Sequence, residues 1–123
     1  MQKIFLADDS GPIRQRLSDQ LGAVEGVTII GHAISAEEAI EAILARKPDV
    51  VVLDLNLMQS SGFDVLRAVR EHAPQIDVYM LSNYAAEPYR RFAAELGARG
   101  FFDKSSEFER VREVIARRAP ITH

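Results

Sequence analysis

The chain has 123 residues, a length typical of one domain, and its 47% hydrophobic and 27% charged residues are the balance of a globular protein. It contains no cysteine, which excludes disulfides, thiolate metal sites and thiol nucleophiles. Its net charge of -3, from 15 Lys and Arg against 18 Asp and Glu, offers no basic field for a nucleic-acid backbone, so we expect no direct binding to nucleic acid.

The first residues, MQKIFLADDS, reach two aspartates after a short apolar stretch. This stretch is too short for the hydrophobic part of a signal peptide and far too short to span a bilayer. We therefore expect a cytoplasmic protein that does not associate with membranes.

Short apolar runs alternate along the chain with longer stretches of helical periodicity. The runs cover residues 4–7, 27–30, 50–53, 78–81 and 101–102. They are almost continuous in Val, Ile, Leu and Phe, which is typical of parallel strands covered on both faces. The pattern predicts five strands and five helices.

Helix boundaries follow from caps and prolines. Ser35 opens a capping box and predicts the start of the second helix, which Pro48 ends. Pro88 fits only the first turn of the fourth helix, so residues 83–87 are expected to be a loop. Arginines in the helical stretches, Arg90 among them, are interleaved with acidic residues, which is typical of solvated faces.

Alternating strands and helices joined by right-handed crossovers predict an α/β fold, with an open, doubly wound parallel sheet of five strands and five helices. Periodicity alone leaves the strand order open. We expect residues 1–119 to form one domain and residues 120–123 to be a tail or the start of a linker. Whether this is a stand-alone protein or the first domain of a longer one is open.

Polar residues follow four of the five predicted strands, at the edge where open parallel sheets bind ligands. They are Asp8 and Asp9 after the first strand, Asp54 after the third, Ser82 after the fourth and Lys104 after the fifth. Taken singly, four of them have a simpler interpretation, because Asp8, Asp9 and Ser82 could cap the helices that follow them and Lys104 could lie on the surface. Their convergence on one edge favours a functional site.

Asp54 directly follows VVVL, where an unpaired charge is costly. Carboxylates about 4 Å apart repel by roughly 4 kcal/mol per pair at an effective dielectric near 20, so the acidic cluster needs a cation. Oxygen ligands without histidine or cysteine favour Mg²⁺, or Mn²⁺ as a substitute, over zinc. A cation and Lys104 beside Asp54 suit in-line phosphoryl transfer onto that carboxylate.

The chain resembles, over nearly its whole length, the receiver domain of two-component response regulators. The resemblance rests on the segments LADDS, VVVLDLNLMQSSG, YMLSN and GARGFFDKS. It implies the flavodoxin-like strand order 2-1-3-4-5. It also implies that Asp54 accepts a phosphoryl group from a phosphohistidine on a histidine kinase or histidine phosphotransfer protein, and that the domain catalyses only its own phosphorylation and dephosphorylation.

The resemblance assigns a metal-binding role to four residues. Asp9 and Asp54 would bind Mg²⁺ directly, Asp8 would act mainly through water, and Asn56 would add its backbone carbonyl. These assignments come from the family pattern and not from spacing.

The residues around the phosphoryl group are assigned in the same way. Lys104 and Ser82 would bind the phosphoryl oxygens, with Asn83 beside them, and Ser82, Phe101 and Tyr84 would form the switch. For Phe101 an ordinary place in the core is the simpler interpretation. As a hypothesis, Tyr84 and Asn56 flank the path of the water that attacks the acyl phosphate.

The chain departs from the family pattern at three positions. Met58 stands where proline is usual, so we expect a looser loop up to Gly62. Asn83 stands where alanine or glycine is common, and its amide would either crowd the phosphoryl pocket or bond within it. Ser105 stands where many members have a cis proline, so we expect no cis bond there.

Phosphorylation adds about -1.5 to -2 charge, and the expected moving parts are the loop after Ser82 and the surface of the fourth helix, fifth strand and fifth helix. A homodimer, if one forms, would use that surface. The effector that reads it is not apparent from the sequence.

Two other functions fit parts of the pattern. An aspartyl-phosphate hydrolase usually needs an acid two residues after the nucleophile, but Asn56 cannot transfer a proton there. A binding module that keeps the fold without being phosphorylated would explain Met58 and Asn83 as drift. The full set of acidic, hydroxyl and lysine residues favours the phosphorylated switch.

Overall fold

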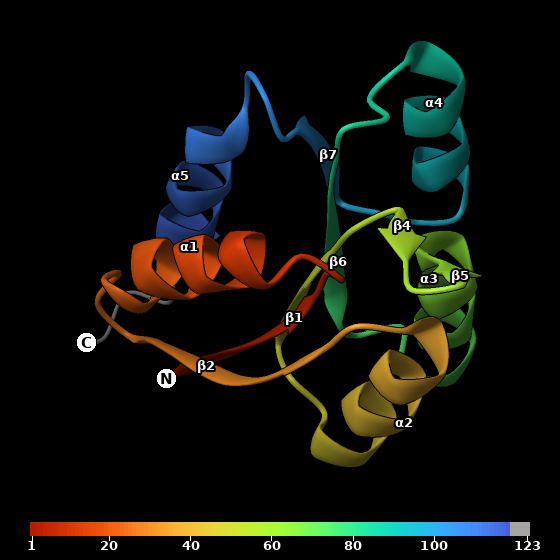
Figure 1. Cartoon of the computed structure of the whole chain (residues 1–123). Helices are drawn as coiled ribbons and strands as arrows, with labels where there is room; N and C mark the ends of the chain where they lie inside the picture. Colours follow the sequence, from red (N-terminus) through yellow and green to blue (C-terminus); the bar gives the residue numbers. More distant parts are fainter. Residues whose placement is uncertain (119–123) are drawn as a thin grey trace.

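The computed structural model describes residues 1–118, which form a five-stranded parallel sheet between two layers of helices (Figure 1). The strands of this sheet are β1 (Gln2–Ala7), β2 (Val27–Ala33), β3 (Val50–Leu53), β6 (Asp77–Ser82) and β7 (Gly100–Asp103). They lie in the order β2-β1-β3-β6-β7, and every neighbouring pair is parallel. Since β6 and β7 are the fourth and fifth strands of this sheet, the predicted doubly wound sheet and its strand order 2-1-3-4-5 are confirmed. The expected tail, residues 120–123, lies outside the described residues.

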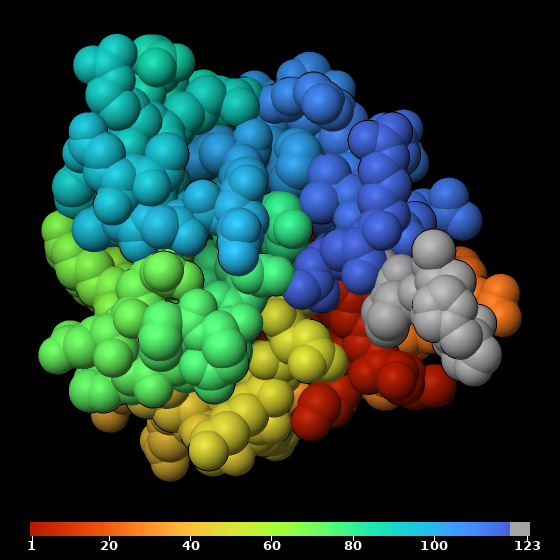
Figure 2. Space-filling model, turned by 180° about the vertical axis from the view of Figure 1, so that it is seen from behind, coloured from red at the N-terminus to blue at the C-terminus, as the bar shows by residue number. Residues whose placement is uncertain are grey.

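Five helices cover the two faces of the sheet. They are α1 (Gly11–Gly22), α2 (Ala36–Arg46), α3 (Gly62–His72), α4 (Glu87–Glu95) and α5 (Phe108–Arg118). α1 and α5 lie on one face, and α2, α3 and α4 lie on the other (Figure 1). Seen from behind, residues of β7 separate α4 from α5 at the surface (Figure 2). Within the described residues, no helix has the length and apolarity needed to cross a bilayer.

The continuous apolar runs fill both layers, because successive side chains of a strand point to opposite faces. In β1, Ile4 and Leu6 belong to the same buried cluster as Ile115 of α5. Phe5, between them, belongs to the cluster on the other face, with Leu66 of α3. The two buried clusters fix the strands relative to one another, so the residues that follow the carboxyl ends of the strands lie at the same edge of the sheet.

The helix caps largely follow the sequence pattern. Ser35 accepts the Glu38 N–H, as predicted, but the return bond of the capping box runs from the Ile34 N–H to the Glu38 carboxylate. The predicted loop 83–87 is one residue too long, since α4 already begins at Glu87.

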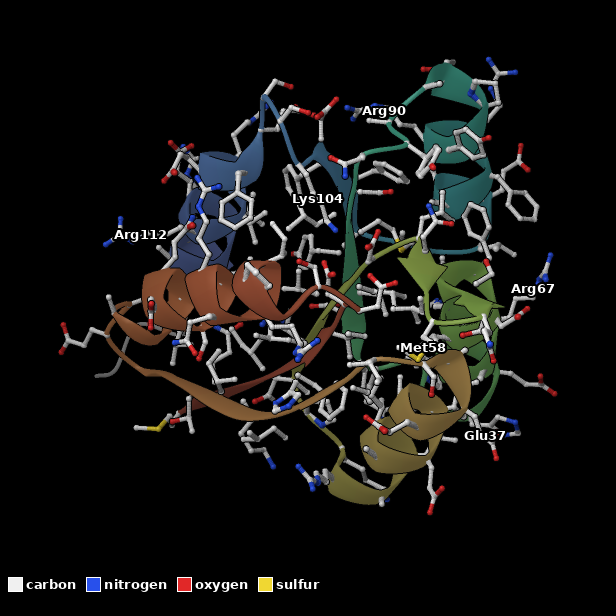
Figure 3. The ribbon with its side chains drawn as sticks, in the orientation of Figure 1. Glu37, Met58, Arg67, Arg90, Lys104 and Arg112 are labelled. Carbon is white, nitrogen blue, oxygen red and sulfur yellow. The ribbon has the colours of Figure 1, made fainter. Side chains whose placement is uncertain are left out.

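The segment between β3 and α3 is an antiparallel hairpin of two short strands, β4 (Asn56–Leu57) and β5 (Ser60–Ser61). The Met58 N–H donates to the Ile34 carbonyl at 2.9 Å, and the Ser60 hydroxyl donates to the Met58 carbonyl at 2.9 Å. Figure 3 shows Met58 beside the start of α2. Paired strands and a hydrogen bond to a neighbouring loop hold this segment in place, and the looser loop expected from Met58 stays a prediction.

Candidate functional site

The carboxyl ends of β1, β3, β6 and β7 meet at a cavity of about 380 Å³. Asp9, Asp54, Ser82 and Lys104 line it, each from a different strand end. Asp8 lies next to them, within ion-pair distance of Lys104. The structure thus brings together all five residues that the sequence places at this edge.

Three carboxylates cluster because of the strand register. Ala7 pairs with Leu53, so the residues that follow them, Asp8 and Asp54, are neighbours, and the Asp54 N–H donates to the Ala7 carbonyl at 2.8 Å. Asp8 is 2% exposed and Asp54 is 5% exposed, while Asp9 is exposed at the rim. One oxygen from each of the three carboxylates lies within 4.8 Å of the others.

Lys104 bridges the two buried carboxylates. Its Nζ lies 2.8 Å from Asp8 Oδ2 and 2.8 Å from Asp54 Oδ2, and only 8% of its side chain is exposed. Burial by itself lowers the pKa of Lys104, but hydrogen bonds with Asp54 and Asp8 outweigh it and raise that pKa. Burial, together with the negative charge of Asp8, raises the pKa of Asp54 more than Lys104 lowers it. A single ammonium shared by two carboxylates does not fully compensate their charge.

The donor set fits a divalent cation. The three carboxylates and the one ammonium have a formal charge of -3 + 1 = -2, which a divalent cation would neutralise. All the available ligands are oxygens, which suits Mg²⁺. Asn56 lies at the rim of the same cavity, and its N–H donates to Asp54 Oδ1 at 3.3 Å. The site therefore has the oxygen ligands and the negative charge that binding of Mg²⁺ requires.

The start of α3 packs against the backbone of Asp54. The Gly62 N–H donates to the Leu55 carbonyl at 2.7 Å, and a Cβ at position 62 would lie 2.1 Å from the Asp54 carbonyl oxygen. Only glycine permits this approach. From the sequence, Gly62 is recognisable only as the end of a loop, because its close contact is with the Asp54 backbone, which no local pattern reveals.

The loop after β6 carries the other predicted residues. Ser82 is fully buried, and its hydroxyl accepts the Tyr84 N–H at 3.1 Å. Asn83 and Tyr84 are exposed and line the cavity, and the ring of Tyr84 meets that of Tyr89 edge-on at 6.2 Å. Among the described residues no peptide bond is cis, including the one before Ser105.

Phe101 does not line the cavity. It is half-buried in β7 and packs against the core beneath α2, α3 and α4. Its carbonyl accepts a hydrogen bond from Arg90 at 2.8 Å, and the guanidinium lies 5.4 Å from the centre of its ring. The expectation that Arg90 belongs to a solvated face is wrong, because its side chain reaches inward to β7.

Comparison with known proteins gives one consistent result. The family model for the response regulator receiver domain matches residues 4–116. The DNA-binding transcriptional activator DevR/DosR of Mycobacterium tuberculosis is 34% identical over 85% of this chain and 48% of its own length. Protein-glutamate methylesterase/protein-glutamine glutaminase 3 of Geobacter sulfurreducens is 35% identical over 94% of this chain and 32% of its own. The chain thus spans half or less of these two curated relatives.

Solved structures agree. The response regulator domain of Thermotoga maritima CheB superposes with a TM-score of 0.86 at 25% identity, over 100% of this chain and 99% of that one. A chain of the CheX-CheY-BeF3-Mg²⁺ complex from Borrelia burgdorferi superposes with a TM-score of 0.81 at 25% identity, over 92% of this chain and 88% of that one.

The close approach at Gly62 predicts a large effect of Gly62→Ala. The new methyl group would collide with the Asp54 carbonyl, so we expect unfolding free energy to fall by about 2–4 kcal/mol and Mg²⁺ affinity to fall with it. Gly22→Ala is the matched control, because nothing lies within 4 Å of its Cβ position. Urea unfolding of both variants measures the difference, and equal stability would contradict the packing argument.

The shared ammonium predicts that Lys104→Met binds Mg²⁺ more tightly than the unaltered chain. A unit charge about 5 Å from a divalent ion contributes about 1.7 kcal/mol even at the dielectric of water, and about 1.4 kcal/mol is a tenfold change in affinity. We therefore expect at least about tenfold tighter binding by calorimetric titration. The control is Lys3→Met, an exposed lysine in β1. Unchanged or weaker binding by Lys104→Met would contradict this electrostatic picture.

Proposed function

Because the chain belongs to the response regulator receiver domain family, the phosphorylation-activated switches of two-component signalling, we propose that Asp54 is the residue that accepts its phosphoryl group. One observation carries this assignment. Asp8 and Asp54 are both buried, both contact Lys104 and share a potential cation site with Asp9, but of these two only Asp54 is among the residues that line the cavity. A donor would approach from this cavity.

The proposed reaction uses the carboxylate of Asp54 as a nucleophile. One of its oxygens forms a bond to phosphorus while the bond between phosphorus and the donor's histidine nitrogen breaks. Lys104, 2.8 Å from Asp54 Oδ2, offsets the negative charge of the phosphoryl oxygens. A bound Mg²⁺ would add positive charge at those oxygens. We propose Asp9, Asp54, the Asn56 carbonyl and, mainly through water, Asp8 as its ligands.

Ser82 and its loop form the responding part of the proposal. The Ser82 hydroxyl already accepts the Tyr84 N–H, and its own hydrogen can be donated to a phosphoryl group on Asp54. Turning toward that group would change the path of residues 83–86 and, with Phe101, the surface of α4, β7 and α5. Asn83, at the cavity rim, is proposed to bond with the phosphoryl oxygens.

The chemical scope and the partners are also part of the proposal. Receiver domains take their phosphate from histidine kinases or phosphotransfer proteins, and relatives of this chain carry output domains. We propose that the chain acts only on its own aspartate, although some relatives bear the names of methylesterases. An α4-β7-α5 homodimer, Mn²⁺ as a substitute and a cytoplasmic location stay predictions.

Acetyl phosphate with Mg²⁺ tests the phosphoacceptor. We expect the intact mass of the chain to rise by one phosphoryl group, and Asp54→Asn to abolish this rise because an amide cannot serve as the nucleophile. The matched control is Asp49→Asn, an exposed aspartate at the opposite end of the same strand. If the mass of the unaltered chain does not rise, the binding module that is not phosphorylated is favoured. If the mass of Asp54→Asn still rises, the phosphoryl group is accepted by a residue other than Asp54.

Tyr84 is expected to lengthen the life of the acyl phosphate. Tyr84 is 53% exposed and lines the same cavity as Asp54, where we propose that it screens the acyl phosphate from water. In Tyr84→Ala the half-life of the phosphorylated chain should fall by about threefold or more, because water is less excluded. Tyr84→Phe, which keeps the ring at the cavity, should change the half-life little. An unchanged half-life in Tyr84→Ala removes this role.

A further inference from the structure

Arg90 of α4 contacts three different segments of the chain. Its guanidinium donates to the Ala85 carbonyl at 2.7 Å, to the Phe101 carbonyl at 2.8 Å and to the Glu107 carboxylate at 2.6 Å. Ala85 belongs to the loop before α4, Phe101 to β7 and Glu107 to the segment just before α5. Figure 3 shows Arg90 between α4 and the chain leading from β7 to α5.

This ion pair differs from the surface pairs of the same helix. The side chains of Arg90 and Glu107 are 33% and 21% exposed, whereas those of the neighbouring pair Arg91 and Glu87 are 68% and 70% exposed. Exposed pairs contribute little to stability, while partly buried, charge-assisted bonds contribute more. The Arg90–Glu107 pair is therefore expected to contribute more to stability than the Arg91–Glu87 pair.

Glu107 extends the contact toward the candidate site. Its Oε1 also accepts the Asp103 N–H at 3.0 Å, and Asp103 is followed directly by Lys104. The Arg90 hydrogen bond, followed by that from the Asp103 N–H, holds the pKa of Glu107 below its usual range, so this carboxylate is ionised at neutral pH. The Arg90–Glu107 pair thus reaches the strand end that carries Lys104.

The other end of the contact reaches the loop that carries Ser82. Residues 83–86 join Ser82 to α4, and within this loop the Tyr84 N–H is bonded to the Ser82 hydroxyl. The Ala85 carbonyl, bound by Arg90, follows directly. A guanidinium has a rigid, planar set of donors, so it keeps all three acceptors only while the Ala85 carbonyl stays in place.

We propose that Arg90 and Glu107 form a latch that holds loop 83–86 in the position where the Ser82 hydroxyl bonds to the Tyr84 N–H. The latch opposes the movement of Ser82 toward a phosphoryl group on Asp54, and this part rests on the proposed function. Within the described part of the chain, Arg90 does not line the cavity and makes no hydrogen bond or ion pair with Asp54, so it is a positioning residue. The strength of the latch sets the free energy needed to move the loop. Phosphorylation shifts the equilibrium between the two loop positions only by as much as it stabilises one position over the other.

Amide hydrogen exchange on the unphosphorylated chain tests the holding role. In Arg90→Ala the Tyr84 amide should exchange about tenfold faster or more, because the loop opens locally, while amides of β1 keep their protection. Arg91→Ala is the matched control, since it removes the adjacent, exposed arginine of α4. Glu107→Gln, a milder change that keeps an acceptor oxygen, should speed the same exchange in the same direction.

The rate of phosphorylation by acetyl phosphate and Mg²⁺ tests the opposing role. We expect Arg90→Ala to react about threefold faster or more, and Arg91→Ala to react at the rate of the unaltered chain. Arg90→Lys should not restore slow reaction, because one ammonium cannot span three acceptors. Faster exchange without faster phosphorylation would show that Arg90 only stabilises the loop and does not oppose its response, and this would overturn the latch. Unchanged exchange would overturn it outright.

These results separate the latch from the proposed function. If the unaltered chain takes no phosphoryl group, the assignment of Asp54 fails. The exchange of the Tyr84 amide then still decides whether Arg90 and Glu107 hold the loop.

Discussion

The contact on which the site depends is one ammonium shared by two buried carboxylates. Lys104 reaches Asp8 and Asp54 at 2.8 Å each, so the ends of three strands must lie at the same level. A parallel sheet with β1 beside β3 achieves this, because the residue pair Ala7 and Leu53 places the next two residues side by side. Any slip of register would separate the charges and leave two carboxylates buried without a partner, which is strongly destabilising.

The two sides of the cavity differ in how firmly they are built. On the side of β3, the Asp54 N–H is bonded within the sheet, and the start of α3 at Gly62 leaves no room for a methyl group. On the side of β6, Asn83 and Tyr84 are exposed and their loop is held mainly by Ser82 and Arg90. Rigid groups suit the chemistry at the carboxylate, whereas a loop of few buried contacts can respond to it.

Sequence reasoning reached the residues whose positions follow from topology, and it missed those whose roles depend on contacts through space. The strand ends meet in any doubly wound sheet, so Asp54 and Lys104 could be placed together from their position alone. Charge pattern on a helix cannot tell which arginine turns inward, and Arg90 was therefore assigned to solvent. Likewise, the presence of methionine instead of proline at position 58 does not reveal that the Met58 N–H donates a hydrogen bond to the Ile34 carbonyl.

The charge balance explains why a response must spread beyond the cavity. Asp8 and Asp9 have a formal charge of -2, and a phosphoryl group on Asp54 would carry about -1.5 to -2 in place of the charge of that carboxylate. Lys104 and one divalent cation supply three positive charges, which is less than this sum, so neutral donors must turn toward the phosphoryl oxygens. The Ser82 hydroxyl is the buried donor at this edge, and its loop is tied through Arg90 to β7 and Glu107. Through these contacts, the proposed phosphorylation would act on the surface formed by α4, β7 and α5.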